Sequence, residues 1–169
     1  MQELTEGQVL KIMESYGNDP QQLIAVLLDI QEASGKNVVE QKWSILASKV
    51  LEVPLSKIYD CLTFYAMFST TPRGRHVIEI CQSTPCHFIE AEQVVGWFET
   101  ALGVKVGCTT DDGVFTLFRT SCVGACDVGP VAKIGDDVFG SLTLDKVNTL
   151  VQSYRDGQPK LREALICQN

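Results

Sequence analysis

Four of the seven cysteines of this chain occur as two close pairs. Four residues separate Cys81 from Cys86, three separate Cys122 from Cys126, and 35 residues lie between the pairs. A disulfide between such close neighbours would constrain very little of the chain, whereas thiolates at short spacing are good metal ligands. The spacing therefore predicts a metal or redox centre made of two loops.

Each pair follows a short run of residues typical of a β-strand. The run from 76 to 80, within "HVIEIC", leads to Cys81, and "VFTLFRTSC", with a predicted strand near 114–119, leads to Cys122. We expect each strand to deliver its first thiol into a loop that also carries the second. The stretch between the pairs is long enough for a helix and a hairpin.

Three kinds of chemistry fit two cysteine pairs. A structural zinc takes four thiolates in a tetrahedron, although two-residue spacers are the more usual pattern. A 2Fe-2S cluster also takes four thiolates, two on each iron, which suits pairs on separate loops. Dithiol redox enzymes use Cys-x-x-Cys, which this chain lacks. Spacing alone leaves these alternatives open.

The residues around the second pair favour hydrogen bonding to sulfur. A loop with Gly124, Ala125, Gly129 and Pro130 has little side-chain bulk, so backbone N–H groups can approach thiolate or sulfide. The glycines could equally be there for a positive φ. The other three cysteines have no partner nearby in sequence and are expected to be structural or incidental: Cys61, Cys108 and Cys167.

Composition and charge exclude several classes of partner. The chain has 169 residues, 45% of them hydrophobic, and a net charge of −7 without any basic run. Nucleic acid is therefore an unfavourable partner. The first residues lack the pattern of a signal peptide, and runs such as "LIAVLL" are too short to cross a membrane. We expect a cytoplasmic protein without direct membrane contact.

The periodicity of the sequence divides the chain into two parts and a tail. Residues 1–72 show helical spacing, at 23–31, around Trp43 to Val50 and across "PLSKIYDCLTFYAMF", and they predict a helical domain. The aromatic side chains of Phe64, Tyr65 and Phe68 are expected to be core. Residues 158–169 are expected to form a C-terminal tail.

Residues 73–157 alternate between strand and helix patterns. After the strand at 76–80 we expect a helix from about Glu90 to Leu102, strands near 104–107 and 114–119, and a hairpin formed by "VAKIG", "DD" and "VFG". A last helix is expected after Thr143, whose hydroxyl can cap it, ending at Gly157. The predicted fold class is α+β, with a helical bundle followed by a thioredoxin-like α/β domain.

Nearly the whole chain resembles the family of thioredoxin-like 2Fe-2S subunits. This family includes the 24 kDa subunit of respiratory NADH dehydrogenase (complex I) and small subunits of NAD-linked hydrogenases and formate dehydrogenases. The resemblance lies in "LLDIQEASG", in "LEVPLSKIYDCLTFYAMFSTTPRGRHVIEIC", in "DDGVFTLFRTSCVGACDVGPVAKIGDDVFGSLT" and in the spacing of the two cysteine pairs. It implies one 2Fe-2S cluster, with Cys81 and Cys86 on one iron and Cys122 and Cys126 on the other.

A few residues depart from the family pattern, none of them at a ligand position. Gly129 stands where alanine commonly precedes proline, Leu144 replaces a frequent proline, and Cys61 and Cys108 are additions. These departures bear on which branch of the family the chain resembles, and they do not change the cysteine pattern of the cluster.

The resemblance also implies what this chain leaves to its partners. There is no G-x-G-x-x-G after a strand and no P-loop, so no catalytic or dinucleotide site of its own is expected. FMN and NAD(P) would be held by a large partner subunit, beside further iron–sulfur subunits of the complex. The expected function is electron transfer in a soluble hydrogenase, with electron-bifurcating hydrogenases included, in a formate dehydrogenase, or in NADH dehydrogenase.

Three further expectations concern alternatives and surfaces. A zinc-stabilised scaffold or interaction module is the alternative function. His87 follows a ligand position and could donate a hydrogen bond to the centre or, less in keeping with four cysteines, bind metal itself. Residues from about 5 to 70 are expected to form much of the docking surface for the flavin subunit, with packing inside the chain as the competing role.

Overall fold

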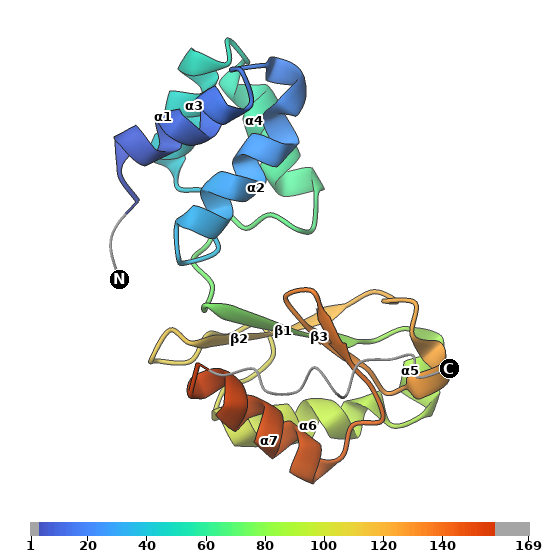
Figure 1. The fold of residues 1–169 in the computed structure, drawn as a ribbon. Coiled ribbons are helices and arrows are strands. Elements are labelled where there is room, and N and C mark those ends of the chain that lie inside the picture. The colour runs from blue at the N-terminus through green and yellow to red at the C-terminus, as the bar shows by residue number, and fades with distance from the viewer. Residues whose placement is uncertain (1–3, 158–169) are drawn as a thin grey trace. The chain divides into compact units, whose positions relative to one another are not determined.

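The computed structural model describes residues 4–157. It divides into two compact units, Met1–Arg73 and Gly74–Asn169 (Figure 1). The first unit contains only helices among its described residues, and the second contains a four-stranded sheet with helices. The α+β fold class predicted from the sequence is confirmed.

Among its described residues, the helical unit contains four α-helices and one short 3-10 turn. The elements are α1 (Glu6–Ser15), η1 (Pro20–Gln22), α2 (Leu23–Ala33), α3 (Gln41–Val50) and α4 (Leu55–Phe64). Local signals start two of them: Thr5 and Gln8 form a capping box before α1, and the Asp19 side chain accepts from the Gln21 amide at η1. Their apolar faces meet in one core, whose fully buried members include Val9, Met13, Val26, Leu27, Ile30 and Ile58.

The end of α4 differs from the prediction in two respects. The helix ends at Phe64, because Tyr65 takes an extended conformation with φ −85° and ψ 120°. Phe68 is core as expected, at 4% exposure, and Tyr65 packs partly against the same core. Phe64 is 80% exposed, so the expectation that it is core is wrong. Because the helix ends here, the Phe64 side chain faces solvent while the next side chain, Tyr65, packs against the core.

The sheet of the α/β unit has the order β2-β1-β3-β4. Its strands are β1 (His76–Cys81), β2 (Phe115–Thr120), β3 (Ala132–Ile134) and β4 (Asp137–Phe139). β1 pairs with β2 in parallel, from His76 opposite Phe115 to Cys81 opposite Thr120, and it pairs with β3 antiparallel. Because β1 and β2 run the same way, the segments that follow them leave the sheet at the same edge.

Two long helices cover one face of this sheet. α6 (Ala91–Leu102) and α7 (Leu144–Arg155) lie side by side beneath the strands in Figure 1. Their buried residues, among them Val94, Phe98, Val147 and Leu150, share one core with Ile78, Ile80, Phe115 and Leu117 of the strands. The Thr143 hydroxyl accepts from the Lys146 amide at 3.4 Å, which confirms the predicted cap of α7.

The strand predicted near 104–107 is absent. Residues 103–107 form a turn, in which the Cys108 amide donates to the Lys105 carbonyl at 3.0 Å. The chain then passes along the outer edge of β2, where the Gly107 amide donates to the Leu117 carbonyl at 2.7 Å. The alternating residues of "VKVG" resemble a strand, but they make a turn that leads into this contact.

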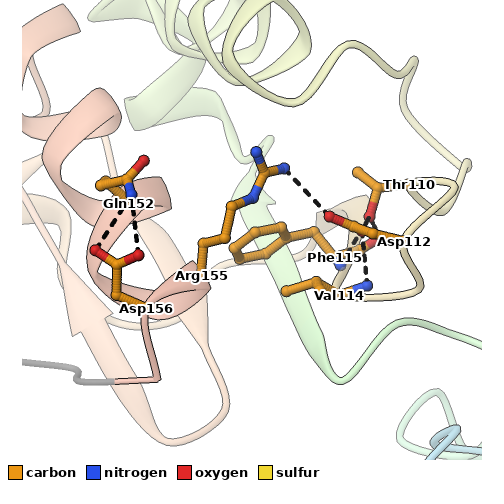
Figure 2. A network of polar contacts seen from close by, with 7 residues as sticks. All are labelled: Thr110, Asp112, Val114, Phe115, Gln152, Arg155 and Asp156. Carbon is orange, nitrogen blue, oxygen red and sulfur yellow. Dashed lines mark hydrogen bonds and ion pairs between the residues drawn. The ribbon is translucent and has the colours of Figure 1, made fainter.

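A polar network fixes the loop that precedes β2 (Figure 2). The Thr110 hydroxyl donates to Asp112 Oδ1 at 2.5 Å and accepts from the Phe115 amide at 3.0 Å. Asp112 Oδ1 also accepts from the Val114 amide at 3.0 Å, and its other oxygen lies 3.4 Å from the Arg155 guanidinium of α7. Figure 2 shows this guanidinium above the Phe115 ring, 5.8 Å from its centroid. The loop is thereby joined to the C-terminal helix.

Candidate metal centre

The two cysteine pairs lie at one edge of the sheet, in segments that follow parallel strands. The first cysteine segment (residues 81–86) begins with the last residue of β1, and the second cysteine segment (residues 122–126) begins two residues after β2. Figure 1 shows the segments beyond β1 and β2 at the same end of the α/β unit. The ladder holds Cys81 opposite Thr120, so the starting points of both segments are fixed by strand pairing.

A short helix, rather than the predicted loop, carries Cys86. This helix, α5 (Thr84–Phe88), has Ser83 before it and proline in its first turn, which are ordinary start signals. It is followed by Ile89 and by Glu90, whose φ of 68° is left-handed. α6 then begins at Ala91.

Cys81 and Cys86 form a buried pair, each about 1% exposed. They pack with Ala91, Ala125 and Val131 in a small apolar cluster of their own. Burial opposes ionisation of Cys81, but hydrogen bonds from the Ser83 and Val123 backbone, from the Ser83 hydroxyl and from Cys86 outweigh it and lower the pKa of the Cys81 thiol. These groups favour a thiolate at Cys81.

The partner thiol has the opposite tendency. Burial, the hydrogen bond with Cys81 and the charge of Cys81 together raise the pKa of Cys86 to about 11, against a favourable hydrogen bond from the Val131 backbone. Cys81 therefore loses its proton more readily than Cys86, which keeps its proton to a higher pH. A cation bound between them would replace that proton, as metal binding to thiols requires.

Cys122 and Cys126 form an exposed pair. Their sulfur atoms are 3.7 Å apart, and the Gly124 amide donates to the Cys122 sulfur at 3.4 Å. The hydrogen bond and the charge of Cys122, together with burial, raise the pKa of Cys126. Two thiolates on one tetrahedral metal, with bonds of about 2.3 Å, would lie about 3.8 Å apart. The pair is thus already spaced for one metal centre.

The two pairs are close enough to influence one another. The charge of Cys81 raises the pKa of Cys126, and the charge of Cys126 raises that of Cys86. Gly129 also connects them, because a Cβ atom at this position would stand 3.5 Å from the Cys86 sulfur and 3.5 Å from the Cys126 carbonyl oxygen. Within residues 4–157, no three His, Cys, Asp or Glu side chains converge on a position for a single ion.

The donor set fits a 2Fe-2S cluster by this geometry and chemistry. Four thiols, arranged as two pairs that interact, match a group whose two irons each take two thiolates. Backbone N–H groups of Gly124, Val123 and Val131 are directed at the sulfurs. Such donors compensate the negative charge that a cluster with four thiolates carries.

Other candidate residues are placed away from this arrangement or outside the described residues. Cys61 is half-buried against the helical core, and Cys108 is exposed. Cys167 and the predicted tail lie outside the described residues. The His87 ring contacts the ring of Phe88, which is strongly exposed, and its charge acts on Glu92.

Sequence reasoning missed contacts that hold the second cysteine segment in place. The Ser141 amide donates to the Val128 carbonyl at 2.5 Å, just after the 3-10 turn η2 (Cys126–Val128), and Gly140 lies against the same residue. On the other side, Arg119 of β2 forms two parallel hydrogen bonds with Glu92 of α6. The only available signals were a glycine after a strand and two opposite charges 27 residues apart.

Comparison with known proteins decides the family. The family model described as "Thioredoxin-like [2Fe-2S] ferredoxin" matches residues 9–155. The chain belongs to this family. The predicted resemblance to thioredoxin-like 2Fe-2S proteins is thereby confirmed.

Individual members of the ferredoxin family give further comparisons. The chain is 30% identical over 147 residues to NADP-reducing hydrogenase subunit HndA of Solidesulfovibrio fructosivorans, a match that covers 87% of this chain and 85% of that one. It is 37% identical over 108 residues to an NADH-quinone oxidoreductase subunit of Rhizobium meliloti, a match that covers 64% of each chain. The match thus spans less than two thirds of the Rhizobium relative.

A solved structure shows the same fold. The crystal structure of an NAD+-reducing [NiFe]-hydrogenase in the air-oxidized state aligns with a TM-score of 0.76 at 19% identity, over 90% of this chain and 26% of that chain. At this identity the likeness concerns the fold of this ferredoxin-family chain alone. No helix within its residues 4–157 combines the length and hydrophobicity needed to cross a membrane.

Proposed function

We propose that Cys81, Cys86, Cys122 and Cys126 bind one 2Fe-2S cluster, and that the chain is the electron-transfer subunit of a multisubunit NAD(P)H-linked, flavin-dependent oxidoreductase. One observation carries the proposal: two sulfur pairs of a 2Fe-2S ferredoxin family member emerge from parallel strands at one sheet edge. We assign Cys81 and Cys86 to one iron and Cys122 and Cys126 to the other.

The cluster supplies reversible one-electron chemistry when bound. The chain's own residues set the environment in which this happens. Burial of Cys81 and Cys86 shields one side of the site from water, and the amides of Val123, Gly124 and Val131 donate to the sulfurs. Cys122 and Cys126 are exposed, so an electron partner can approach the site on their side.

The chain needs a partner to exchange electrons with a nicotinamide. The sequence contains neither a dinucleotide-binding G-x-G-x-x-G nor a P-loop. FMN and NAD(P) therefore belong to a large partner subunit, and further iron–sulfur subunits complete the complex. The names of its relatives support a hydrogenase or an NADH dehydrogenase of the complex I type, and the family resemblance adds formate dehydrogenase. We propose a cytoplasmic location for the chain.

The helical unit supports docking to such a partner. α4 presents Leu55 and Tyr59 to solvent, and Phe64 and Met67 are exposed at and beyond its end. A groove of about 340 Å³ lies beside this helix, lined by Val39, Ser44, Leu62 and Thr70 as well as by Leu55 and Tyr59. Exposed aromatic and methionine side chains are frequent at protein interfaces. We propose this face as the main contact with the flavin subunit.

The first experiment measures the metal content of the anaerobically purified chain. We expect iron and inorganic sulfide in equal amounts, a visible absorption spectrum that bleaches on addition of dithionite, and no zinc. A colourless protein with one zinc per chain would instead establish the zinc-stabilised scaffold. NADH should leave the spectrum of the isolated chain unchanged, and bleaching by NADH alone would contradict the assignment of the flavin and the nicotinamide to a partner.

A second experiment addresses the docking face. Tyr59→Ala and Phe64→Ala should each reduce co-purification with the co-expressed flavin subunit while the cluster spectrum stays unchanged. Leu10→Ala, an exposed apolar residue on α1, is the matched control and should co-purify normally. Equal recovery of all three variants would show that this face does not dock the partner.

A further inference from the structure

An ion pair joins the two elements that flank the cysteine pairs. Arg119 lies in β2, three residues before Cys122, and Glu92 lies in the first turn of α6, six residues after Cys86. Arg119 Nη2 donates to Glu92 Oε2 at 2.7 Å, and Nη1 donates to Oε1. Two parallel hydrogen bonds fix the orientation of both side chains, which a single contact would not do.

Strand pairing alone does not place the end of the first cysteine segment. The β1–β2 ladder ends with Cys81 opposite Thr120, and the chain then continues through α5 and the left-handed Glu90 before it enters α6. A left-handed conformation is sterically unfavourable for a non-glycine residue. It persists where the surrounding structure determines it.

The residues next to Glu90 contribute little to holding its left-handed conformation. Glu90 stands at the N-cap of α6, yet its side chain makes no capping hydrogen bond. The Ile89 amide donates to the Cys86 carbonyl at 3.2 Å, which closes α5 but does not orient α6. Glu92, two residues further on, joins the start of α6 to β2 through its side chain, beside the buried Ala91.

Both charges are present at neutral pH. The hydrogen bond from Arg119, opposed by burial and supported by the charges of Arg119 and His87, holds the pKa of the Glu92 carboxyl below its ordinary value. The side chains are 31% and 53% exposed, and ion pairs with such exposure contribute little to global stability. What distinguishes the Glu92–Arg119 ion pair is therefore its position beside both cysteine segments, and not its contribution to stability.

We propose that Glu92 and Arg119 are positioning residues: they hold the α5–α6 junction against β2 and so set the placement of Cys86 relative to Cys122 and Cys126. This inference rests on the proposed cluster. Neither side chain is assigned as a ligand. Their effect on the site passes through the backbone of the two cysteine segments.

The same helix offers a matched control. Lys105 Nζ lies 2.6 Å from Glu99 Oε2, in an ion pair that joins α6 to the turn after it. Glu99 is two helical turns from Glu92, and this pair contacts neither cysteine segment directly. Lys105→Gln therefore removes an ion pair of α6 and leaves both hydrogen bonds between Arg119 and Glu92 in place.

The experiment compares four variants of the full chain: E92Q, R119Q, the charge swap E92R/R119E, and K105Q. The visible circular dichroism of the loaded protein reports the geometry of the site, and the absorbance decay in excess chelator reports its retention. We expect E92Q and R119Q to change the dichroism in the same direction and to speed the decay about twofold to fivefold, as loss of an exposed ion pair would. The charge swap should recover much of the wild-type behaviour, and K105Q should match the wild type.

The outcomes separate this inference from the proposed function. If the wild type is loaded and E92Q and R119Q behave like it, the inference alone is overturned. Unchanged dichroism with reduction potentials displaced in opposite directions by E92Q and R119Q would also overturn it, because that pattern reports charge and not position. A wild-type chain that binds no cluster would overturn the proposed function as well. Equal melting of the cluster-free variants and wild type is expected, and it excludes general unfolding as the cause.

Discussion

Gly74 lies against the main chain of Phe115, where the α/β unit begins. A Cβ atom on Gly74 would stand 2.5 Å from the Phe115 carbonyl carbon and 2.8 Å from its nitrogen and its oxygen. The Gly74 amide also donates to the buried Thr116 hydroxyl at 2.6 Å. Only a residue without a side chain permits this approach, because the opposing atoms belong to the backbone of β2 and have no room to retreat.

We therefore expect Gly74→Ala to reduce the free energy of unfolding of the α/β unit by about 1–3 kcal/mol, the usual cost of forcing extra volume into a packed site. Urea denaturation followed by circular dichroism measures this. Gly96→Ala is the control, since Gly96 is exposed inside α6 with nothing near its Cβ position. It should stabilise the protein by about 0.5–1 kcal/mol, and a loss at Gly96 equal to that at Gly74 would contradict the contact described.

Gly140→Ala should disturb the second cysteine segment. Its Cβ would stand 2.6 Å from the Val128 carbonyl oxygen and 2.7 Å from the Val128 Cβ, so the 3-10 turn that starts at Cys126 must shift. We expect a faster loss of cluster absorbance in chelator, by about threefold or more if the strain resembles ordinary overpacking.

Gly129→Ala is the informative comparison for Gly140→Ala. Here the obstructing atom is the end of the partly exposed Ile89 side chain, which can swing away. The loss of absorbance should therefore be slower than in Gly140→Ala, and Ile89→Ala combined with Gly129→Ala should restore the wild-type rate. The reverse order of the two glycine variants would be inconsistent with these contacts.

Thr110→Val should destabilise the loop before β2. The Thr110 side chain is 5% exposed, and its hydroxyl both accepts from the Phe115 amide and donates to Asp112, as Figure 2 shows. Valine keeps the shape but leaves buried polar groups without this partner, at a cost of about 1–3 kcal/mol. Thr110→Ser retains the hydroxyl and should lose less stability in the same denaturation experiment.

His76 should make the stability of the α/β unit depend on pH. Burial, and then the charge of Arg75, lower the pKa of the imidazole, which lies 5.0 Å from the Tyr154 ring and 5.9 Å from the Phe115 ring between centroids. The unfolded chain therefore binds a proton at a higher pH than the folded chain does. Stability is complete above the ordinary pKa of about 6.5 and falls as the pH drops below it.

Thermal melts between about pH 5.5 and 7.5 test this, because most carboxyl groups remain ionised in that window. The melting temperature of the wild type should fall towards pH 5.5, and that of His76→Phe should fall less. A parallel decrease in both proteins would assign the effect to another group.

Cysteine replacements test the ligand assignment. Cys81→Ser, Cys86→Ser, Cys122→Ser and Cys126→Ser should each lose most of the bound iron, because serine oxygen suits iron and sulfide poorly compared with thiolate. Cys61→Ser and Cys108→Ser should retain it. Iron and sulfide analysis after anaerobic purification provides the measurement, and loss of iron in Cys108→Ser with retention in Cys126→Ser would show that the pairs are wrongly assigned.

Elements with strong local signals were predictable from the sequence. The cap at Thr143, the periodicity of Val147, Leu150 and Val151, and the short apolar runs of β1 and β2 act within a few residues of one another. The end of α4 was not predictable in this way. The pattern of apolar and aromatic residues continues through Tyr65, where the backbone changes to an extended conformation.

The parts of the candidate site that have local sequence signals were also predictable. Two strand-like runs that each end at a cysteine indicate a shared sheet edge once the strands are parallel. The α5 helix had a signal in Ser83 and the following proline, which a loop assignment overlooked. The Glu92–Arg119 pair had no signal beyond its two opposite charges, since a contact between residues 27 positions apart follows from the packing of α6 on the sheet.

The turn found in place of the expected strand near 104–107 bears on association between chains. Residues 107–110 occupy hydrogen-bonding groups on the outer side of β2: the Leu117 amide donates to the Cys108 carbonyl at 3.2 Å, and the Thr110 amide to the Phe115 carbonyl at 2.9 Å. Open strand edges template pairing with other chains, and proteins protect them by covering them or keeping them short. Here β2 is covered and the opposite edge strand, β4, has only three residues. The described part of the α/β unit therefore leaves little open strand edge for pairing with other chains, whether or not a cluster is bound.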